Sequence, residues 1–132
     1  MDRACRMSES QEACANVAVT RERAGRREAA RSAAEYAESL PGTAFGFYNL
    51  ACYRALAGER PAALVSLGRS FELGFADLLI ESDGDLDSLR SDPAFAGILL
   101  EVRDRVNDRR ETSGSVFPWQ SRSFFENSVT FG

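Results

Sequence analysis

The chain has 132 residues, a formal net charge of −4 and 44% hydrophobic residues. This length fits one domain with a modest helical core, and the scattered charge argues against nucleic acid, whose binders carry basic patches. Every basic residue is arginine, and histidine and lysine are both missing. That excludes a P-loop lysine, a Schiff base, a histidine general base and a histidine metal ligand. We therefore expect no enzyme, no cofactor and no metal site.

Residues 1–10 are polar and unpatterned, which predicts a disordered N-terminus. They lack the apolar run of a signal peptide, and no window approaches the ~20 apolar residues of a membrane span. We expect a cytoplasmic protein without a membrane partner. Cys5, Cys14 and Cys52 are too widely spaced for a zinc or CxxC motif, and an odd number does not suit a secreted disulfide framework. Cys14 and Cys52 are interpreted as small apolar packing residues, with a reactive thiol as the alternative.

The segment 16–40 recurs at 49–73, an offset of 33 residues. A self-match at this period is typical of stacked helical hairpins, each too small to bury its own apolar face. Such repeats usually form binding surfaces rather than catalytic sites. The identical pairs are Asn16/Asn49, Ala18/Ala51, Arg21/Arg54, Ala24/Ala57, Gly25/Gly58, Arg27/Arg60, Ala29/Ala62, Ala30/Ala63 and Leu40/Leu73.

Apolar spacing predicts the elements of both units in chain order. A helix is expected over 11–24, a break at Gly25, and an alanine-lined helix over 26–40 that stops at Pro41. In the second unit a helix precedes Gly58, and Pro61 fits the first turn of the next helix, which ends at about residue 73. The second unit has the larger side chains, so we expect it to form most of the core and the alanine-rich first unit to lie outside.

A closing segment follows. Leu86 and Leu89 are expected on a short helical turn, and Asp92 followed by Pro93 predicts the N-cap and first residue of a final helix that ends near Asp108. The helical domain thus spans 11–110. The aromatic-containing tail, 111–132, leaves three alternatives open: it folds back along the stack, binds a partner, or is unordered.

Acidic residues alternate between Glu81 and Asp87, as carboxylates do in a calcium loop. An EF-hand loop requires glycine at its sixth position, and counting from Glu81 places Leu86 there. The acidic run is therefore interpreted as helix capping and a solvated turn.

The stretch YNLACYRALAGERPAALVSLGRSFELGF resembles a tetratricopeptide repeat, with Gly58, Ala63 and Leu67 at the turn, small-contact and large apolar positions of that family. The segment GFADLLIESDGDLDSLRSDPAFAGIL resembles the closing segment after the last repeat in bacterial members. The resemblance covers about residues 12–103. It implies an all-α fold, a right-handed stack of two tetratricopeptide-like hairpins plus a capping helix.

In that architecture the first helix of each repeat lines a concave face that binds a peptide or helix. The resemblance implies a protein–protein interaction module, an adaptor or scaffold, whose ligand is an apolar helix or an aromatic-bearing segment. The alternative is a structural or regulatory fragment of a larger repeat protein whose groove is filled by its own tail or by a second copy. The second case predicts a homo-oligomer. The partner-binding residues expected on the concave face are Asn16, Arg23, Phe45, Tyr48, Asn49, Cys52 and Leu56.

Overall fold

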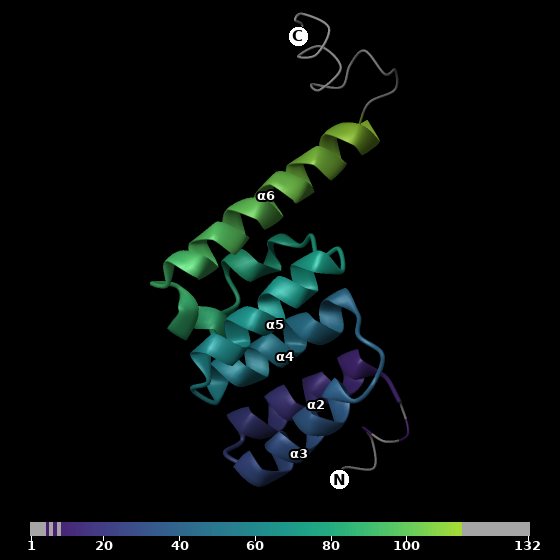
Figure 1. Cartoon of the computed structure of the whole chain (residues 1–132), viewed down its shortest axis with the longest axis vertical. Coiled ribbons are helices and arrows are strands. Elements are labelled where there is room, and N and C mark those ends of the chain that lie inside the picture. The colour runs from purple at the N-terminus through teal and green to yellow at the C-terminus, as the bar shows by residue number, and fades with distance from the viewer. Residues whose placement is uncertain (1–4, 6, 8, 115–132) are drawn as a thin grey trace, which may run out of the picture.

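A computed structural model describes residues 5, 7 and 9–114, and every regular element among them is a helix. None of the helices in this part of the chain has the length and apolar character needed to cross a membrane. Figure 1 shows the helices stacked one above another along the long axis. The elements are α2 (Gln11–Arg23), α3 (Arg27–Glu38), α4 (Ala44–Leu56), α5 (Arg60–Glu72), η1 (Leu78–Glu81), η2 (Gly84–Leu89) and α6 (Pro93–Gly114).

The two predicted units are two helical hairpins, α2–α3 and α4–α5, with matching turns. Gly25 and Gly58 have φ values of +80° and +84°, the left-handed conformation that closes a helix C-terminus. In the first turn the Arg26 N–H donates to the Arg21 carbonyl at 2.9 Å. The corresponding bond of the second turn measures 2.8 Å. The sequence repeat is therefore a structural repeat down to its hydrogen bonds.

The helix N-termini repeat as well. The Ser10 hydroxyl accepts from the Ala13 N–H at 3.2 Å, and the Thr43 hydroxyl accepts from the Gly46 N–H at 2.9 Å. Ser10 and Thr43 are 33 residues apart, like the glycines. Each hydroxyl satisfies one of the backbone donors that a helix leaves unpaired at its start.

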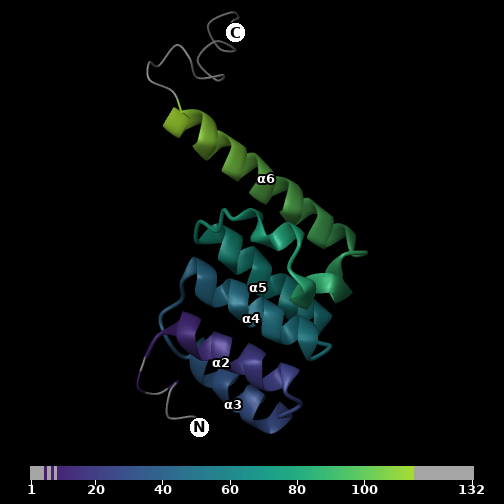
Figure 2. The same cartoon turned by 180° about the vertical axis from the view of Figure 1, so that it is seen from behind.

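The hairpins stack through their first helices, α2 against α4 (Figure 2). The approach is close at Gly46, where an added Cβ would lie 2.2 Å from Oε1 of the buried Gln11 side chain. Gln11 also links the hairpins by accepting from the N–H of Thr43, the N-cap of α4, at 3.1 Å, and it donates to the Ala37 carbonyl within its own hairpin at 3.3 Å.

The core is unequal between the hairpins, as the sequence predicted. The first hairpin contributes mainly alanines, including Ala18, Ala33 and Ala37, whereas the second contributes Tyr48 and Leu67. Alanine removes little apolar surface from water, so most of the hydrophobic stabilisation comes from the second hairpin and the closing segment.

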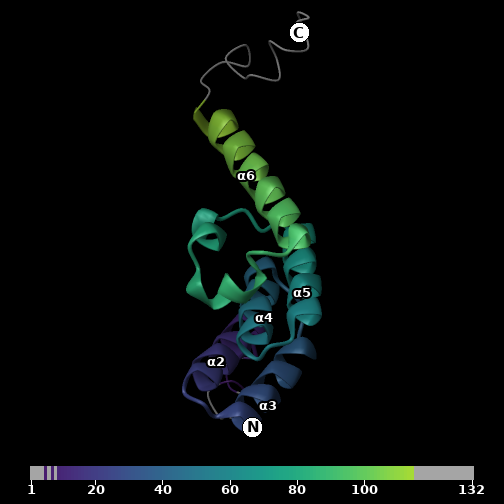
Figure 3. The ribbon, with the colours of Figure 1, turned by 90° about the vertical axis from the view of Figure 1, so that its left-hand side faces the viewer.

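The closing segment covers the second hairpin. Ile80, Leu86 and Leu89 are fully buried, and η2 packs against α4 while α6 packs against α5 and η1 (Figure 3). The predicted cap at Asp92 is confirmed, because its Oδ1 accepts from the Ala94 N–H at 2.8 Å. Arg105 fastens α6, donating to the carbonyls of Phe71 and Phe75 at 2.7 and 3.0 Å.

One boundary prediction is wrong, the end of the final helix. Helix α6 continues to Gly114 rather than ending near Asp108, so four residues assigned to the tail are helical. Once a helix is formed each further residue adds a hydrogen bond, and no proline interrupts the chain before Pro118. The expectations for the aromatic residues of the tail (Phe117, Trp119, Phe124, Phe125 and Phe131) lie outside the described residues.

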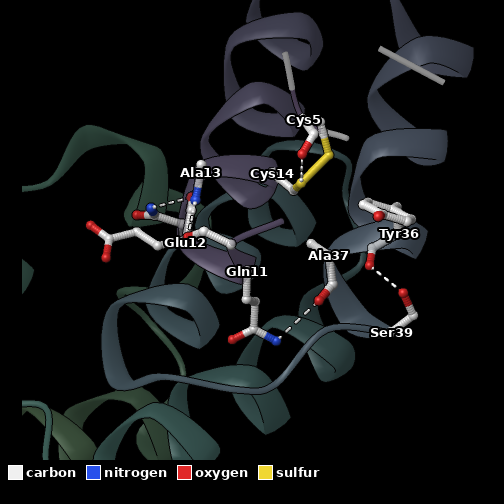
Figure 4. The surroundings of a disulfide bond; sticks show 10 residues. Cys5, Gln11, Glu12, Ala13, Cys14, Tyr36, Ala37 and Ser39 are labelled. Carbon is white, nitrogen blue, oxygen red and sulfur yellow. Dashed lines mark hydrogen bonds between the residues drawn. A yellow bond between two sulfur atoms is a disulfide. The ribbon is translucent and has the colours of Figure 1, made fainter. Parts of the chain in front are cut away.

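The N-terminal prediction also needs correction, because Cys5 is fully buried and forms a disulfide with Cys14. Glu9 has a φ of +50°, and its N–H donates to the Cys5 carbonyl at 3.3 Å. This left-handed residue reverses the chain and brings Cys5 beside α2 (Figure 4). Cys14 is buried as expected, yet it is bonded rather than free. Neither the spacing nor the odd cysteine count revealed a local reversal of this kind.

Candidate functional site

The residues expected on the concave face come from the two first helices. Asn16 and Arg23 lie on α2, and the other five lie on α4. Their exposure differs strongly: Asn16 and Arg23 are exposed, Phe45 is 37% exposed, and Tyr48 and Cys52 are only 1% and 2% exposed. The face is therefore open along α2 and at the start of α4, and it is closed in the middle of α4.

The chain's own acidic segment closes it. Oδ2 of Asp83, at the start of η2, accepts hydrogen bonds from the Tyr48 hydroxyl at 2.7 Å and from the Cys52 thiol at 3.7 Å. The Ser88 hydroxyl, further along η2, donates to the Ala55 carbonyl at 3.4 Å. The prediction that Tyr48 and Cys52 are available to a partner is wrong, because η2 occupies their side of α4.

Asp83 is fixed from several directions. Its Oδ1 caps η2 by accepting from the Asp85 N–H at 3.0 Å, and its backbone carbonyl accepts from Arg90 Nη2 at 2.7 Å. Arg90 is itself held by Asp87 at 2.9 Å. With Leu86 buried beneath the same turn, the segment is part of the core rather than a displaceable strap.

Arg23 is the third predicted residue drawn into this network. Its Nε and Nη2 donate to the two carboxylate oxygens of Asp85 at 3.1 and 2.5 Å. This bidentate salt bridge joins the end of α2 to η2. The hydrogen bond to Asp85 raises the pKa of Arg23, so the guanidinium stays charged. Arg23 thus serves to tie the first hairpin to the closing segment.

Burial beside Asp83 raises the pKa of two side chains of α4, the Tyr48 hydroxyl and the Cys52 thiol. For Tyr48 the loss of water is the main cause and the hydrogen bond to Asp83 the second. For Cys52 the loss of water again comes first, followed by the negative charge of Asp83. Both groups therefore stay protonated at neutral pH and act as donors to the carboxylate.

An aromatic cluster borders the network. The rings of Tyr48 and Phe75 are stacked, with centroids 4.6 Å apart and planes 6° from parallel. Phe45 packs edge-on against Phe75 with centroids 5.2 Å apart. Phe45 is the exposed member, so its outer face is the aromatic surface that this part of α4 offers to a partner.

The two equivalent asparagines remain accessible. Asn16 is exposed on α2, and Asn49 is partly exposed on α4 with its side-chain nitrogen 3.4 Å from the Glu12 carbonyl. A hydrogen bond of this length is weak. Leu56, the last predicted residue, is partly buried and packs against the core. The open strip thus consists of Asn16, Asn49 and Phe45.

Cys52, Asp83 and Asp85 lie close enough to share a cation, because one ligand atom from each falls within 4.8 Å of the others. Protein donors already satisfy the two carboxylates: the Tyr48 hydroxyl serves Asp83 and the Arg23 guanidinium serves Asp85. The raised pKa of Cys52 also disfavours the thiolate that a metal needs. The arrangement fits a structural hydrogen-bond network better than a metal centre.

Two open hollows lie away from the network. One sits between the hairpins and the other between the starts of α5 and α6, and neither is lined by a residue predicted for the concave face. The first is lined by Arg31, Ala34, Glu35, Glu38, Tyr53, Arg54 and Glu59. The second is lined by Arg60, Pro61, Leu64, Ser88, Ser91, Asp92, Pro93 and Ala94.

Sequence reasoning missed the role of Asp83 and Asp85. The acidic run was interpreted as capping and a solvated turn, and the capping part is confirmed for Asp83. Its second role, as acceptor for two side chains of α4, has no local signal because the partners lie 31 and 35 residues away.

No known family, curated protein or solved structure matches this chain.

Proposed function

We propose that this chain is a protein–protein interaction module, an adaptor or scaffold of tetratricopeptide-like architecture, that binds a peptide or helix along its first helices. The observation that carries the proposal is the pair Asn16 and Asn49. They occupy the same position in two stacked hairpins, and both are accessible on one side of the stack. Binding rather than catalysis, and a cytoplasmic location, remain predictions from the composition.

The accessible strip defines the kind of ligand. An amide side chain offers both a donor and an acceptor, so two amides one repeat apart suit the backbone of an extended segment whatever its sequence. The exposed face of Phe45, next to Asn49 on α4, suits an apolar or aromatic side chain of the same ligand. Tyr48 and Cys52 contribute by supporting the strip from beneath and not by touching the ligand.

One observation favours the alternative, a structural or regulatory fragment whose concave face is filled internally. Residues 83–89 already cover the middle of α4, so the free strip is narrower than a groove of two complete repeats. A short strip gives modest affinity unless a second copy extends it, which keeps a homo-oligomer among the proposals.

Selection from a random peptide library tests the proposal. Peptides selected on the wild type are assayed by fluorescence polarisation against the Asn16→Ala/Asn49→Ala double variant and against Val65→Ala. Val65 is 66% exposed on α5, away from the strip, and serves as the matched control. We expect binding that survives Val65→Ala and falls at least about tenfold in the double variant, the loss of roughly 1.4 kcal/mol.

Peptides that bind all three proteins equally would contradict the assignment of this strip. Light scattering on the same samples distinguishes the alternative. A wild-type dimer that dissociates in the double variant would show that a second copy occupies the strip.

A further inference from the structure

The disulfide between Cys5 and Cys14 joins the segment before α2 to the buried side of that helix (Figure 4). Both cysteines are fully buried and belong to the hydrophobic core. The bond closes over a sequence separation of only nine residues, at the outer hairpin of the stack. It is therefore placed to act on the α2–α3 hairpin and not on the second hairpin.

The turn that carries Cys5 is unfavourable by itself. Glu9 has a φ of +50°, which costs a side-chain-bearing residue roughly 1–2 kcal/mol, and the backbone bond from its N–H to the Cys5 carbonyl is long at 3.3 Å. The covalent bond to Cys14 offsets that cost. When the bond is broken, no covalent link holds Cys5 at Cys14, and Glu9 can return to a negative φ.

The α2–α3 hairpin, which carries the disulfide, gains little stability from its own hydrophobic core. Its buried residues are mainly alanines, each of which buries far less apolar surface than the tyrosines and leucines of α4 and α5. In a stacked repeat each hairpin contributes its own stability plus the interface with its neighbour, so the weaker outer hairpin can open locally.

The remaining cysteine, Cys52, is not part of this disulfide. Cys52 is 2% exposed, and its thiol donates to Asp83 under η2. Burial also raises the pKa of this thiol, which keeps it out of thiol–disulfide exchange. Cys5 and Cys14 therefore form and break their bond as an isolated pair.

We propose that the Cys5–Cys14 bond is a redox switch that sets how readily the α2–α3 hairpin opens. A dithiol is the reductant: when the outer hairpin opens locally, one of the dithiol's thiolates reaches a sulfur of the buried pair and attacks it to give a mixed disulfide. Its second thiol then releases the protein as two thiols and leaves the reagent as a cyclic disulfide. Two electrons and two protons pass to the protein. A low-molecular-weight disulfide reverses the step and is itself reduced to two thiols.

Hydrogen exchange measured by mass spectrometry on the full chain tests the switch. The wild type is compared as oxidised protein, after treatment with dithiothreitol, and after reoxidation with oxidised glutathione. Cys5→Ser cannot form the bond, and Cys52→Ser is the matched control because it removes a thiol and keeps a donor to Asp83. Hydrogen exchange reports on the fold alone, so the result does not depend on whether the stack binds a partner.

We expect amides of α2 and α3 to exchange at least about tenfold faster after reduction, while those of α4 and α5 are unchanged and reoxidation restores the slow rates. Cys5→Ser exchanges rapidly with or without dithiothreitol, and Cys52→Ser follows the wild type. Equal rates in the oxidised and reduced wild type would overturn the proposal, as would uniform acceleration in all helices. Three free thiols after incubation with oxidised glutathione would overturn it as well.

Discussion

Tyr48 and Asp83, which are 35 residues apart, share a 2.7 Å hydrogen bond that joins the first helix of the second hairpin to the segment closing the stack. The carboxylate also accepts from Cys52 and caps η2, so one side chain connects two elements. Residues expected to face a ligand instead hold the molecule together. Substitutions of Tyr48 and Cys52 on α4 are therefore expected to change the stability of the fold rather than the binding of a ligand.

Removing the tyrosine hydroxyl tests this connection. Tyr48→Phe keeps the stacked ring and leaves Asp83 short of its better donor, so we expect a loss of about 1–3 kcal/mol in the free energy of unfolding. Urea denaturation followed by circular dichroism measures it. Tyr36→Phe, at a half-buried tyrosine of α3, is the control and should change the stability by less than about 0.5 kcal/mol. Equal effects of the two substitutions would show that the hydroxyl of Tyr48 contributes nothing special.

Alkaline pH provides a second test. The ordinary pKa values of Cys52 and Tyr48 are 9.0 and 10.0, and both are raised in the folded state. The unfolded chain loses the Cys52 proton near pH 9 and the Tyr48 proton near pH 10, while the folded chain keeps both. The stabilisation from these two groups is therefore fully present below pH 9 and falls as the pH rises further. Each group contributes up to about 1.4 kcal/mol per pH unit.

Chemical denaturation between neutral pH and pH 10 measures this slope. Cys52→Ser should flatten it, because serine does not titrate in this range. A slope that is unchanged in that variant would contradict the assignment of the first alkaline step to Cys52.

Two helical glycines make a matched pair. A Cβ at Gly46 would lie 2.2 Å from Oε1 of the buried Gln11, whereas a Cβ at Gly68 meets nothing within 4 Å. We expect Gly46→Ala to destabilise the fold by about 1–3 kcal/mol through overpacking between α2 and α4. Gly68→Ala should stabilise it by about 0.5–1 kcal/mol, because alanine is the better helix former. Thermal denaturation of both variants checks the opposite signs.

We expect the ion pair of Arg23 with Asp85 to contribute little to the free energy of unfolding, although its geometry is bidentate. The arginine side chain is 57% exposed, so water and salt screen the interaction. A double-mutant cycle with Arg23→Gln and Asp85→Asn should yield a coupling below about 1 kcal/mol that shrinks in high salt. Arg110→Gln, on the exposed side of α6, controls for the change in net charge. A larger, salt-independent coupling would show that the pair is effectively buried.

Local patterns were enough to predict most of the fold. Gly25 and Gly58 marked both turns, Asp92 and Pro93 marked the start of α6, and the apolar spacing placed the helices to within a few residues. These features depend on neighbours in sequence, so one sequence suffices to read them. The end of α6 was missed because its last turn carries no clear signal for or against a helix.

The candidate site was predicted less well, and for a physical reason. Whether Tyr48 and Cys52 are accessible depends on where η2 packs. The sequence pattern of α4 does not indicate which distant segment will cover it. Asn16 and Phe45 are exposed, and their contact with a partner stays a prediction. Cys5 shows the same limit, since its bond with Cys14 depends on a chain reversal at Glu9.

The docking of η2 on α4 also limits how long such a molecule can become. A further hairpin placed after Glu72 would compete with η2 for the same flank and would separate Asp83 from Tyr48 and Cys52. A 33-residue unit inserted ahead of Thr43 would leave that contact intact and would meet only the α2–α4 type of interface. The closing segment therefore terminates the stack, and a longer stack would be designed by adding hairpins on the N-terminal side.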